Sequence, residues 1–222
     1  MSLPGTPVSA PNGLRGFDTN TILTDTTAAA FRAEGYTYCI RYLSRVAKQG
    51  SADLTAQEAR AILKAGLALM TVQHVRLQDW DPTAELGASD GVHAAYHAMV
   101  IGFPPGVNIW CDLEGVRAGT PQQSVIDYCN EWADAVAAAG YIPGLYVGAA
   151  SILDGHVLHD RLHFQHYWKS LSTVPDIAIR GYQMIQTSGV PVNGVGIDNN
   201  ITLSDRQGGN VVWLAPTPVV VT

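Results

Sequence analysis

The sequence predicts a single α/β domain folded as a (β/α)8 barrel of the TIM type, with irregular last crossovers. Eight short apolar runs alternate with amphipathic or loop segments, which is the pattern of a parallel sheet joined by crossover helices. The 222 residues, 47% of them hydrophobic, suffice for one barrel with a sizeable core. No Gly-rich phosphate loop follows the first run, which reads Gly16-Phe17-Asp18-Thr19-Asn20, so a closed barrel is favoured over an open doubly wound sheet.

The predicted strands are the short apolar runs themselves. They cover residues 14–18, 37–43, 67–75, 107–114, 142–148, 163–168, 181–186 and 195–198. Amphipathic segments between them predict helices at 26–35, 55–66, 83–102, 121–140 and 151–162. Several of these begin after Thr, Ser or Asp and end at Gly, as helix capping favours. The stretches 170–180 and 187–194 are too short or irregular to predict helices, and they form the irregular crossovers.

The two ends of the chain are predicted to lie outside the barrel, which we place at residues 14–214. Residues 1–13 are rich in Pro and small residues and predict a flexible segment, and residues 215–222 predict a C-terminal tail. The start of the chain lacks the basic residues and apolar core of an ordinary signal peptide, and no run reaches the ~18 apolar residues of a membrane span. Direct secretion by the general pathway is therefore not predicted, although a phage or specialised export route would leave no such mark.

The composition restricts the class of partner. Only 14% of residues are charged, below the roughly 25% of an average soluble domain, and the net charge is −6. Nucleic acid is an unsuitable partner because no basic cluster is present, whereas an uncharged polymer such as a polysaccharide is compatible. The chain is expected to act as a monomer. Cys39, Cys111 and Cys129 are expected to be buried reduced thiols.

Two carboxylates end the fourth apolar run. Asp112 and Glu114 are two residues apart, so in a strand they share a face, while Ile109, Cys111 and Leu113 point the other way. Like charges that close push their pKa values apart, which suits one group to donate a proton while the other stays ionised. The alternative is a strand that leaves the core into an acidic turn.

Two further aspartates end other predicted strands. Asp18 ends the first and Asp198 the eighth, and these two strands are neighbours in a closed barrel. The fourth strand, with Asp112 and Glu114, lies across the mouth from them. Catalytic groups of such barrels sit at the C-terminal strand ends. Each aspartate alone is more often a cap or turn residue, but the four carboxylates together predict a functional cleft, because unpaired buried charges are costly.

Aromatic and amide side chains accompany these carboxylates. Tyr146 lies on the fifth run, Trp168 ends the sixth, and Gln183 or Gln186 lies on the seventh. Aromatic faces stack on sugar rings, and Tyr and Gln hydrogen-bond to hydroxyl and acetamido groups, so a sugar-binding cleft is predicted. Trp80, in the loop after the third run, is a further candidate platform. The alternatives are ordinary barrel packing for Tyr146 and Trp168 and a loop anchor for Trp80.

The ordered set of motifs resembles a known group over about residues 14–203. It comprises Gly16-Phe17-Asp18, Ile40-Arg41-Tyr42-Leu43, Asp112-Leu113-Glu114, the strand of Tyr146, Gln186-Thr187-Ser188-Gly189 and Gly196-Ile197-Asp198-Asn199-Asn200. This set is similar to the lysozymes of glycoside hydrolase family 25. It is more similar still to the related glycoside-hydrolase-like domain family of bacterial proteins.

The resemblance implies a barrel that cleaves the β-1,4 bond after N-acetylmuramic acid in peptidoglycan. Glu114 would be the general acid, which requires a raised pKa. Asp112 would orient the acetamido group or stabilise the oxocarbenium-like centre, in a retaining or substrate-assisted course. Asp18 and Asp198 would shape the cleft and tune the pKa of Glu114. The resemblance also makes Arg41, in the second motif, a substrate-binding candidate beside the Tyr146, Trp168, Gln186 and Trp80 set.

Other functions fit the sequence less well. A barrel that binds or anchors to cell-wall glycan without cleaving it is the main alternative. A chitinase is disfavoured because Trp110 stands where its motif requires Asp. His93 and His97 have zincin spacing, but Ala94 replaces the required Glu. A metal site is not predicted from the remaining cluster, which is His156, His159, His163 and His166. No Gly-x-Ser-x-Gly elbow is present, and no cofactor is predicted.

Overall fold

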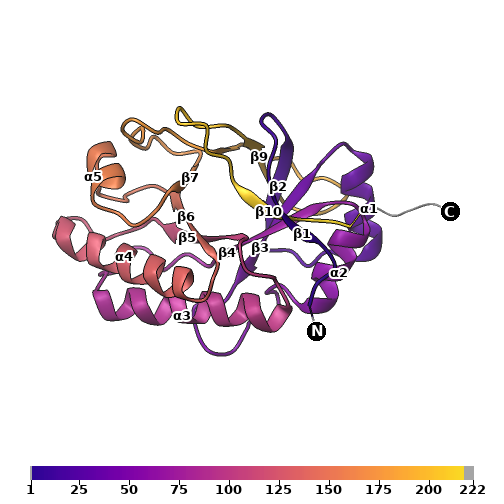
Figure 1. Cartoon of the computed structure of the whole chain (residues 1–222), viewed down its shortest axis with the longest axis horizontal. Helices are drawn as coiled ribbons and strands as arrows, with labels where there is room; N and C mark the ends of the chain where they lie inside the picture. Colours follow the sequence, from indigo (N-terminus) through magenta and orange to yellow (C-terminus); the bar gives the residue numbers. More distant parts are fainter. Residues whose placement is uncertain (1, 218–222) are drawn as a thin grey trace.

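Eight strands close into a barrel in the computed structural model, which describes residues 2–217 (Figure 1). Each strand pairs with the next along the chain, and the last pairs with the first. The predicted fold class and seven of the eight predicted strand positions are confirmed, with ends that differ by a few residues. The eighth predicted strand, 195–198, shares only Asp198 with the observed strand Asp198–Thr202. The barrel strands are β2 (Arg15–Thr19), β3 (Tyr38–Leu43), β4 (Ala68–Gln73), β5 (Asn108–Leu113), β6 (Ile142–Val147), β7 (His166–Lys169), β8 (Met184–Thr187) and β9 (Asp198–Thr202).

The direction of β9 differs from the parallel strand that the sequence predicts. β9 runs antiparallel to both β2 and β8, and Asp198 begins the strand instead of ending it. A parallel strand needs a crossover of a dozen or more residues, and the ten residues 188–197, which include Pro191, form no helix. The chain therefore turns directly back. Because β9 is reversed, its start lies at the same end of the barrel as the ends of the other strands, opposite Asp18.

Five helices match the five predicted segments. Their starts follow from capping: the side chains of Thr24, Thr55 and Thr83 each accept a hydrogen bond from a backbone N–H in the first turn. The predicted irregular crossovers after β7 and β8 are also confirmed, since neither contains a helix. The helices are α1 (Asp25–Ala33), α2 (Ala56–Lys64), α3 (Ala84–Ile101), α4 (Gln122–Ala138) and α5 (Gly155–Asp160).

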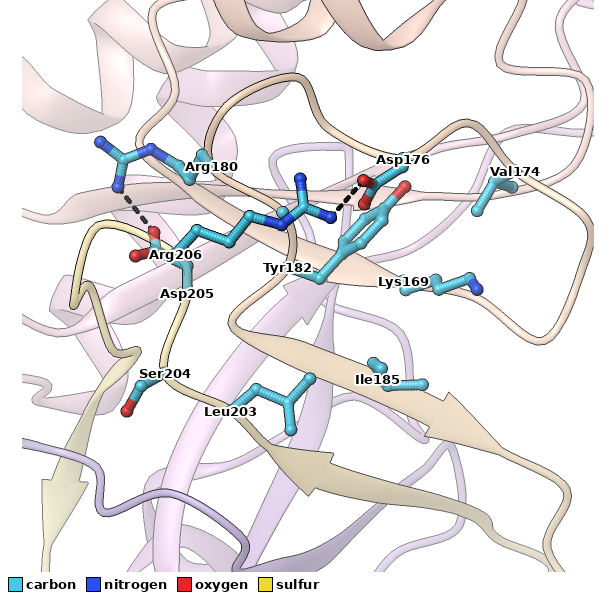
Figure 2. A pocket seen from close by; sticks show the side chains of 11 residues that line it. Lys169, Val174, Asp176, Arg180, Tyr182, Ile185, Leu203, Ser204, Asp205 and Arg206 are labelled. Atoms are coloured by element: carbon cyan, nitrogen blue, oxygen red, sulfur yellow. Dashed lines mark hydrogen bonds and ion pairs between the residues drawn. The ribbon is translucent and has the colours of Figure 1, made fainter.

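Loops and ion pairs cover the side of the barrel at β7 and β8, where no crossover helices are present (Figure 2). Arg180 bonds to Asp205 at 2.9 Å, and Arg206 bonds to Asp176 at 2.5 Å. A cavity of about 310 Å³ remains between these loops and the outer face of β8, where Ile185 contributes to its lining. This cavity lies outside the barrel wall.

The N-terminal segment is not the flexible stretch that the sequence predicts. Residues Thr6–Ser9 form β1, which pairs antiparallel with β10 (Val212–Ala215), and β10 continues onto β4. Pro7 had suggested flexibility, but β1 is an edge strand, where a missing N–H is tolerated. Ala215 belongs to β10, so the predicted tail begins inside a strand, and residues 218–222 of that tail lie outside the described range.

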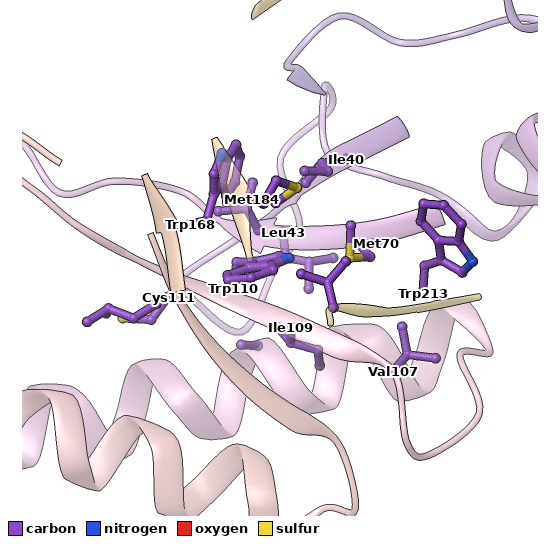
Figure 3. Close-up of a cluster of buried hydrophobic side chains, with 14 of the residues drawn as sticks. Ile40, Leu43, Met70, Val107, Ile109, Trp110, Cys111, Trp168, Met184 and Trp213 are labelled. Carbon is purple, nitrogen blue, oxygen red and sulfur yellow. The ribbon is translucent and has the colours of Figure 1, made fainter. Parts of the chain in front are cut away.

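Buried apolar side chains pack on both faces of the barrel strands (Figure 3), and large ones fill the inside of the barrel. Trp110 and Trp168 are buried and meet edge to face at 5.8 Å between ring centroids. Gly144 allows this packing, because a Cβ there would lie 2.4 Å from the Trp110 ring. The interior is thus occupied at this level, and open space is found toward the ends of the strands. Within residues 2–217, no helix has the length and apolar character that crossing a membrane requires.

Candidate active site

A cavity of about 150 Å³ opens at the mouth of the barrel, where the parallel strands end and β9 begins. Three of the four predicted carboxylates line it, and the fourth, Asp18, is hydrogen-bonded to two of the lining side chains, Tyr42 and Gln186. The larger cavity on the β8 flank contains none of the four. The lining residues of the mouth cavity are Tyr42, Val72, Val75, Asp112, Glu114, Tyr146, Trp168, Gln186 and Asp198.

Asp18 is a buried carboxylate surrounded by donors. Its side chain accepts hydrogen bonds from Asn200 Nδ2 at 2.8 Å, Gln186 Nε2 at 3.0 Å and the Tyr42 hydroxyl at 3.2 Å. Burial raises the pKa of Asp18 to about 6, and the charge of Asp198 adds to the rise, although the three hydrogen bonds oppose it. Asp18 therefore fixes the polar side chains beneath the cavity.

Asp112 and Glu114 both line the cavity, as their spacing predicts. Burial raises the pKa of Asp112 well above its ordinary value, and the charges of Glu114 and Asp18 raise it further. Burial also raises the pKa of Glu114, against a backbone hydrogen bond from Ala149. The Oδ1 atom of Asp112 is buried and has no hydrogen-bond partner among the described residues. The pair thus retains a proton at a pH where exposed carboxylates are ionised.

Gly148 makes room for Glu114. A Cβ at position 148 would lie 2.3 Å from the Glu114 Cβ and 2.5 Å from its Oε2. The backbone around both residues is joined by hydrogen bonds from Gly148 N to Leu113 O at 2.9 Å and from Gly115 N to Ala149 O at 2.8 Å. The backbone at the end of β6 therefore leaves space for the Glu114 side chain and holds it in position.

The predicted aromatic and amide residues form one side of the cavity. The Tyr146 hydroxyl donates to Gln186 Oε1 at 3.0 Å, and Tyr146 meets Trp168 edge to face at 4.6 Å. Trp168 is only 1% exposed and donates from Nε1 to Asn200, so it is a buried wall and not an open stacking platform. Of the two glutamines left open by the sequence, Gln186 lines the cavity, while Gln183 is buried beside Tyr167.

Trp80 and Arg41 do not line the cavity. Trp80 donates from Nε1 to the backbone oxygen of Glu114 at 2.8 Å, so it anchors its loop to the end of β5. Arg41 is fully buried and bonds through Nε to Glu58 Oε1 at 2.6 Å. Residues alternate between the two faces of a strand, and Tyr42, its neighbour in β3, faces the cavity. The complete burial of Arg41 therefore corrects its predicted substrate-binding role, whereas the role of Trp80, which is half-buried, stays a prediction.

Sequence reasoning missed Tyr42, Asn200 and Gly148 as parts of the site. Tyr42 belongs to the Ile40-Arg41-Tyr42-Leu43 motif. Because adjacent residues of a strand face opposite ways, only one of Arg41 and Tyr42 could face the cavity, and the sequence indicated that both had to be considered. Asn200 follows Asp198 by two residues, so a strand that begins at Asp198 places both on one face. This could be used only if the strand was known to begin at Asp198 and not to end there.

Other reactive residues lie apart from this site. Cys39, Cys111 and Cys129 are buried and unbonded, as expected, and burial raises the pKa of each thiol. His159 and His163 pair with acidic neighbours, at 2.6 Å and 2.8 Å respectively. Within residues 2–217, no three His, Cys, Asp or Glu side chains form a group that could hold a metal ion.

The fold and the cavity together define a glycoside hydrolase-like barrel, in which acidic residues gather at the mouth. The chain belongs to the family of Rv2525c-like, glycoside hydrolase-like domains, whose sequence model matches residues 29–202. The matched range includes Asp112, Glu114 and Asp198 and begins after Asp18. No curated protein matches the chain.

Solved structures with this fold include hydrolases and proteins of unassigned activity. Rv2525c, a Tat-secreted protein of Mycobacterium tuberculosis solved with L-tartrate, is 20% identical, with a TM-score of 0.67 over 87% of this chain and 96% of that one. An uncharacterized B. stearothermophilus protein is 20% identical, with a TM-score of 0.63 over 86% and 96%. A lysozyme from Streptomyces coelicolor is 12% identical, with a TM-score of 0.58 over 87% and 93%. At these identities the likeness establishes the fold alone.

Proposed function

We propose that the protein is a glycoside hydrolase of bacterial cell-wall peptidoglycan, similar in action to an N-acetylmuramidase. Glu114 is the proton donor and Asp112 assists it. The observation that carries this proposal is the pair of carboxylates with raised pKa values in one cavity at the barrel mouth. A glycosidase needs an acid that remains protonated at working pH and a second carboxylate close by.

Substrate binding would place the proton of the pair on Glu114. In the free protein burial raises the pKa of both carboxyl groups, and Asp112 has a buried oxygen without a partner among the described residues. An acetamido N–H that donates to this oxygen would stabilise the ionised form of Asp112 and lower its pKa. The nearby negative charge of Asp112 would then raise the pKa of Glu114. The acid is therefore protonated when the sugar is in place.

The remaining polar residues hold the sugar and the carboxylates in position. Tyr146 and Gln186 are joined by a hydrogen bond, and Gln186 also bonds to Asp18, so these side chains need no rearrangement on binding. Asp198 lines the cavity beside Asp18 and adds negative charge, from which an oxocarbenium-like centre would gain. The volume of about 150 Å³ is below the roughly 300–1,000 Å³ of most ligand sites, which suits one sugar unit with the glycan strand extending over the rim.

The decisive experiment measures release of reducing ends from purified peptidoglycan. The wild type is expected to release them, and Glu114→Gln is expected to lose at least about 100-fold in rate, the usual minimum for removing a general acid. Glu131→Gln is the matched control, because Glu131 is an exposed residue of α4 away from the cavity. Full activity in Glu114→Gln would refute the assignment of the acid.

A non-catalytic glycan-binding barrel is the second candidate. The small cavity favours it, because one bound sugar unit can anchor a protein to the wall without hydrolysis. Sedimentation with purified wall distinguishes the two functions. If the wild type and Glu114→Gln both pellet with the wall and both release no reducing ends, binding is the function and hydrolysis is excluded.

A further inference from the structure

Arg45 has no hydrogen-bond or ion-pair partner within the part of the chain that the structure describes. Every other arginine of the described residues makes a hydrogen bond or ion pair with a side chain or a backbone oxygen. Arg45 makes none with residues 2–217, although its side chain is half-buried and its Nε atom is fully enclosed. A partly buried guanidinium group without an acceptor is unfavourable, and a ligand that supplies an acceptor to its terminal nitrogens would stabilise it.

Arg45 follows a strand that ends at the mouth of the barrel. It is two residues beyond the end of β3, the strand whose Tyr42 lines the mouth cavity, and it is not itself one of the lining residues. Its positive charge acts on Asp112 and opposes the rise in the pKa of that carboxyl group. Arg45 is therefore close enough to Asp112 to interact with it electrostatically, while no hydrogen bond joins them.

The backbone on both sides of Arg45 is held in place. The oxygen of Ser44 accepts from Gln73 Nε2 at 3.2 Å, and the nitrogen of Ser44 donates to Gln49 Oε1 at 2.8 Å. The oxygen of Val46 accepts from His97 Nε2 at 2.7 Å. A loop tip without function needs no such support. The fixed backbone presents a free guanidinium group, which is the arrangement of a preorganised binding residue.

The charges around the cavity limit what Arg45 can bind. Asp18, Asp112, Glu114 and Asp198 make the interior acidic, so an anionic group would be repelled there. The planar guanidinium of Arg45 can donate two parallel hydrogen bonds to a carboxylate that projects from the cavity toward it. A sugar ring in the cavity with a carboxylate substituent directed outward satisfies both conditions.

We propose that Arg45 binds a carboxylate carried by the sugar unit that occupies the cavity, so that the natural ligand is an acidic glycan. This inference rests on the proposed function only in taking a glycan as the occupant. In peptidoglycan the carboxylate would come either from the lactyl group of muramic acid or from a peptide attached to it.

Calorimetric titration of non-cleaving protein tests the inference. In a Glu114→Gln background, a GlcNAc–MurNAc tetrasaccharide with free lactyl carboxylates is compared with neutral chitotetraose. Arg45→Gln is expected to weaken binding of the acidic tetrasaccharide roughly tenfold, since a charged hydrogen bond is lost, and to change chitotetraose binding less than about twofold. Arg45→Lys should recover part of the affinity. Lys48→Gln, an exposed cation in the same loop, is the control and should change neither.

The outcomes separate this inference from the proposed function. A third ligand, the tetrasaccharide with peptides attached, identifies the source: an Arg45-dependent preference for it assigns the carboxylate to the peptide. Equal losses on acidic and neutral ligands, no loss on either, or no binding of any acidic glycan would overturn the role of Arg45. Arg45-dependent binding by a wild type that releases no reducing ends would uphold the inference and refute hydrolysis.

Discussion

Asp18 makes the free energy of unfolding dependent on pH. It is 3% exposed, and its pKa of about 6 compares with an ordinary value of 3.8. Between these two values the folded chain binds more protons than the unfolded chain. The contribution of Asp18 to the free energy of unfolding therefore decreases as the pH rises from about 4 to about 6, and it stays lower above that range.

Asp18→Asn is expected to stabilise the protein at neutral and alkaline pH. The amide keeps hydrogen-bonding capacity toward Gln186, Asn200 and Tyr42 and removes the buried charge. The gain is expected to be about 1–3 kcal/mol at pH 8 and close to zero at pH 4, since each tenfold change in proton affinity is about 1.4 kcal/mol. Urea unfolding at both pH values measures it. Asp25→Asn, at an exposed position, is the control, and a gain that is equal at pH 4 and pH 8 would contradict the assignment.

Gly148→Ala tests whether the position of the Glu114 side chain matters, without a change in charge. The backbone of Gly148 is not in the left-handed region, so the expected effect comes from the new Cβ, which would overlap Glu114. If the proposed function is correct, displacement of the acid should reduce the rate of peptidoglycan hydrolysis by about 100-fold. Gly196→Ala is the matched control, because a Cβ at that position would have no described atom within 4 Å and activity should be retained. Full activity in Gly148→Ala would mean that the position of Glu114 is not critical.

At the scale of elements, local patterns predicted most of the fold. Helices α1, α2 and α3 begin at Thr caps that the sequence displays, and seven of the eight apolar runs coincide with barrel strands. The direction of β9 could not be predicted in this way. The direction of a strand depends on the connection that precedes it and not on its own side chains. The strand β1 was missed because its pairing with β10 joins residues more than 200 positions apart.

The site was predictable where side-chain parity and strand ends decide it. Asp112 and Glu114 are two residues apart, and Tyr146 lies on the neighbouring strand, so all three reached the cavity as predicted. Arg41 was assigned wrongly because its motif was considered as a unit, although adjacent residues of a strand face opposite ways. Arg45 lacks a hydrogen-bond partner because of how the surrounding residues pack in three dimensions. No sequence pattern could predict this.

Two glycines determine the contact between α3 and α4, which lie side by side in Figure 1. A Cβ at Gly87 would lie 2.1 Å from the backbone oxygen of Tyr128, and one at Gly91 would lie 2.6 Å from that of Trp132. The helices therefore approach with their backbones almost in contact. Larger side chains at these positions would separate the two helices, which both pack against β5.

Gly87→Ala is expected to destabilise the protein, contrary to helix propensity. In an exposed helix this change would stabilise by about 1 kcal/mol, but here the new methyl group overlaps α4, so a loss of about 1–3 kcal/mol is expected. Urea unfolding measures the difference. The control is Ala137→Gly on the exposed face of α4, which should cost about 1 kcal/mol through propensity alone. A stabilised Gly87→Ala would show that α3 and α4 can move apart freely.

At the scale of the whole molecule, the net charge of −6 opposes the approach of the acidic glycan that we propose as ligand. Arg45 offers attraction only at short range, whereas the repulsion extends over the whole surface. The two act on different steps, since the long-range field affects association and the contact with Arg45 affects the bound state.

Salt is therefore expected to accelerate the reaction at low substrate concentration. The distance over which charges interact falls from about 30 Å at 0.01 M salt to about 8 Å at 0.15 M, so repulsion between the chain and an acidic oligosaccharide is largely screened. We expect kcat/KM for a soluble peptidoglycan oligosaccharide to rise about two- to fivefold over this range. Neutral chitotetraose, if it is cleaved, should show no rise. Arg45→Gln should keep the rise while its kcat/KM is lower at every salt concentration. A decrease of kcat/KM with salt would instead mean that attraction by local cations governs association.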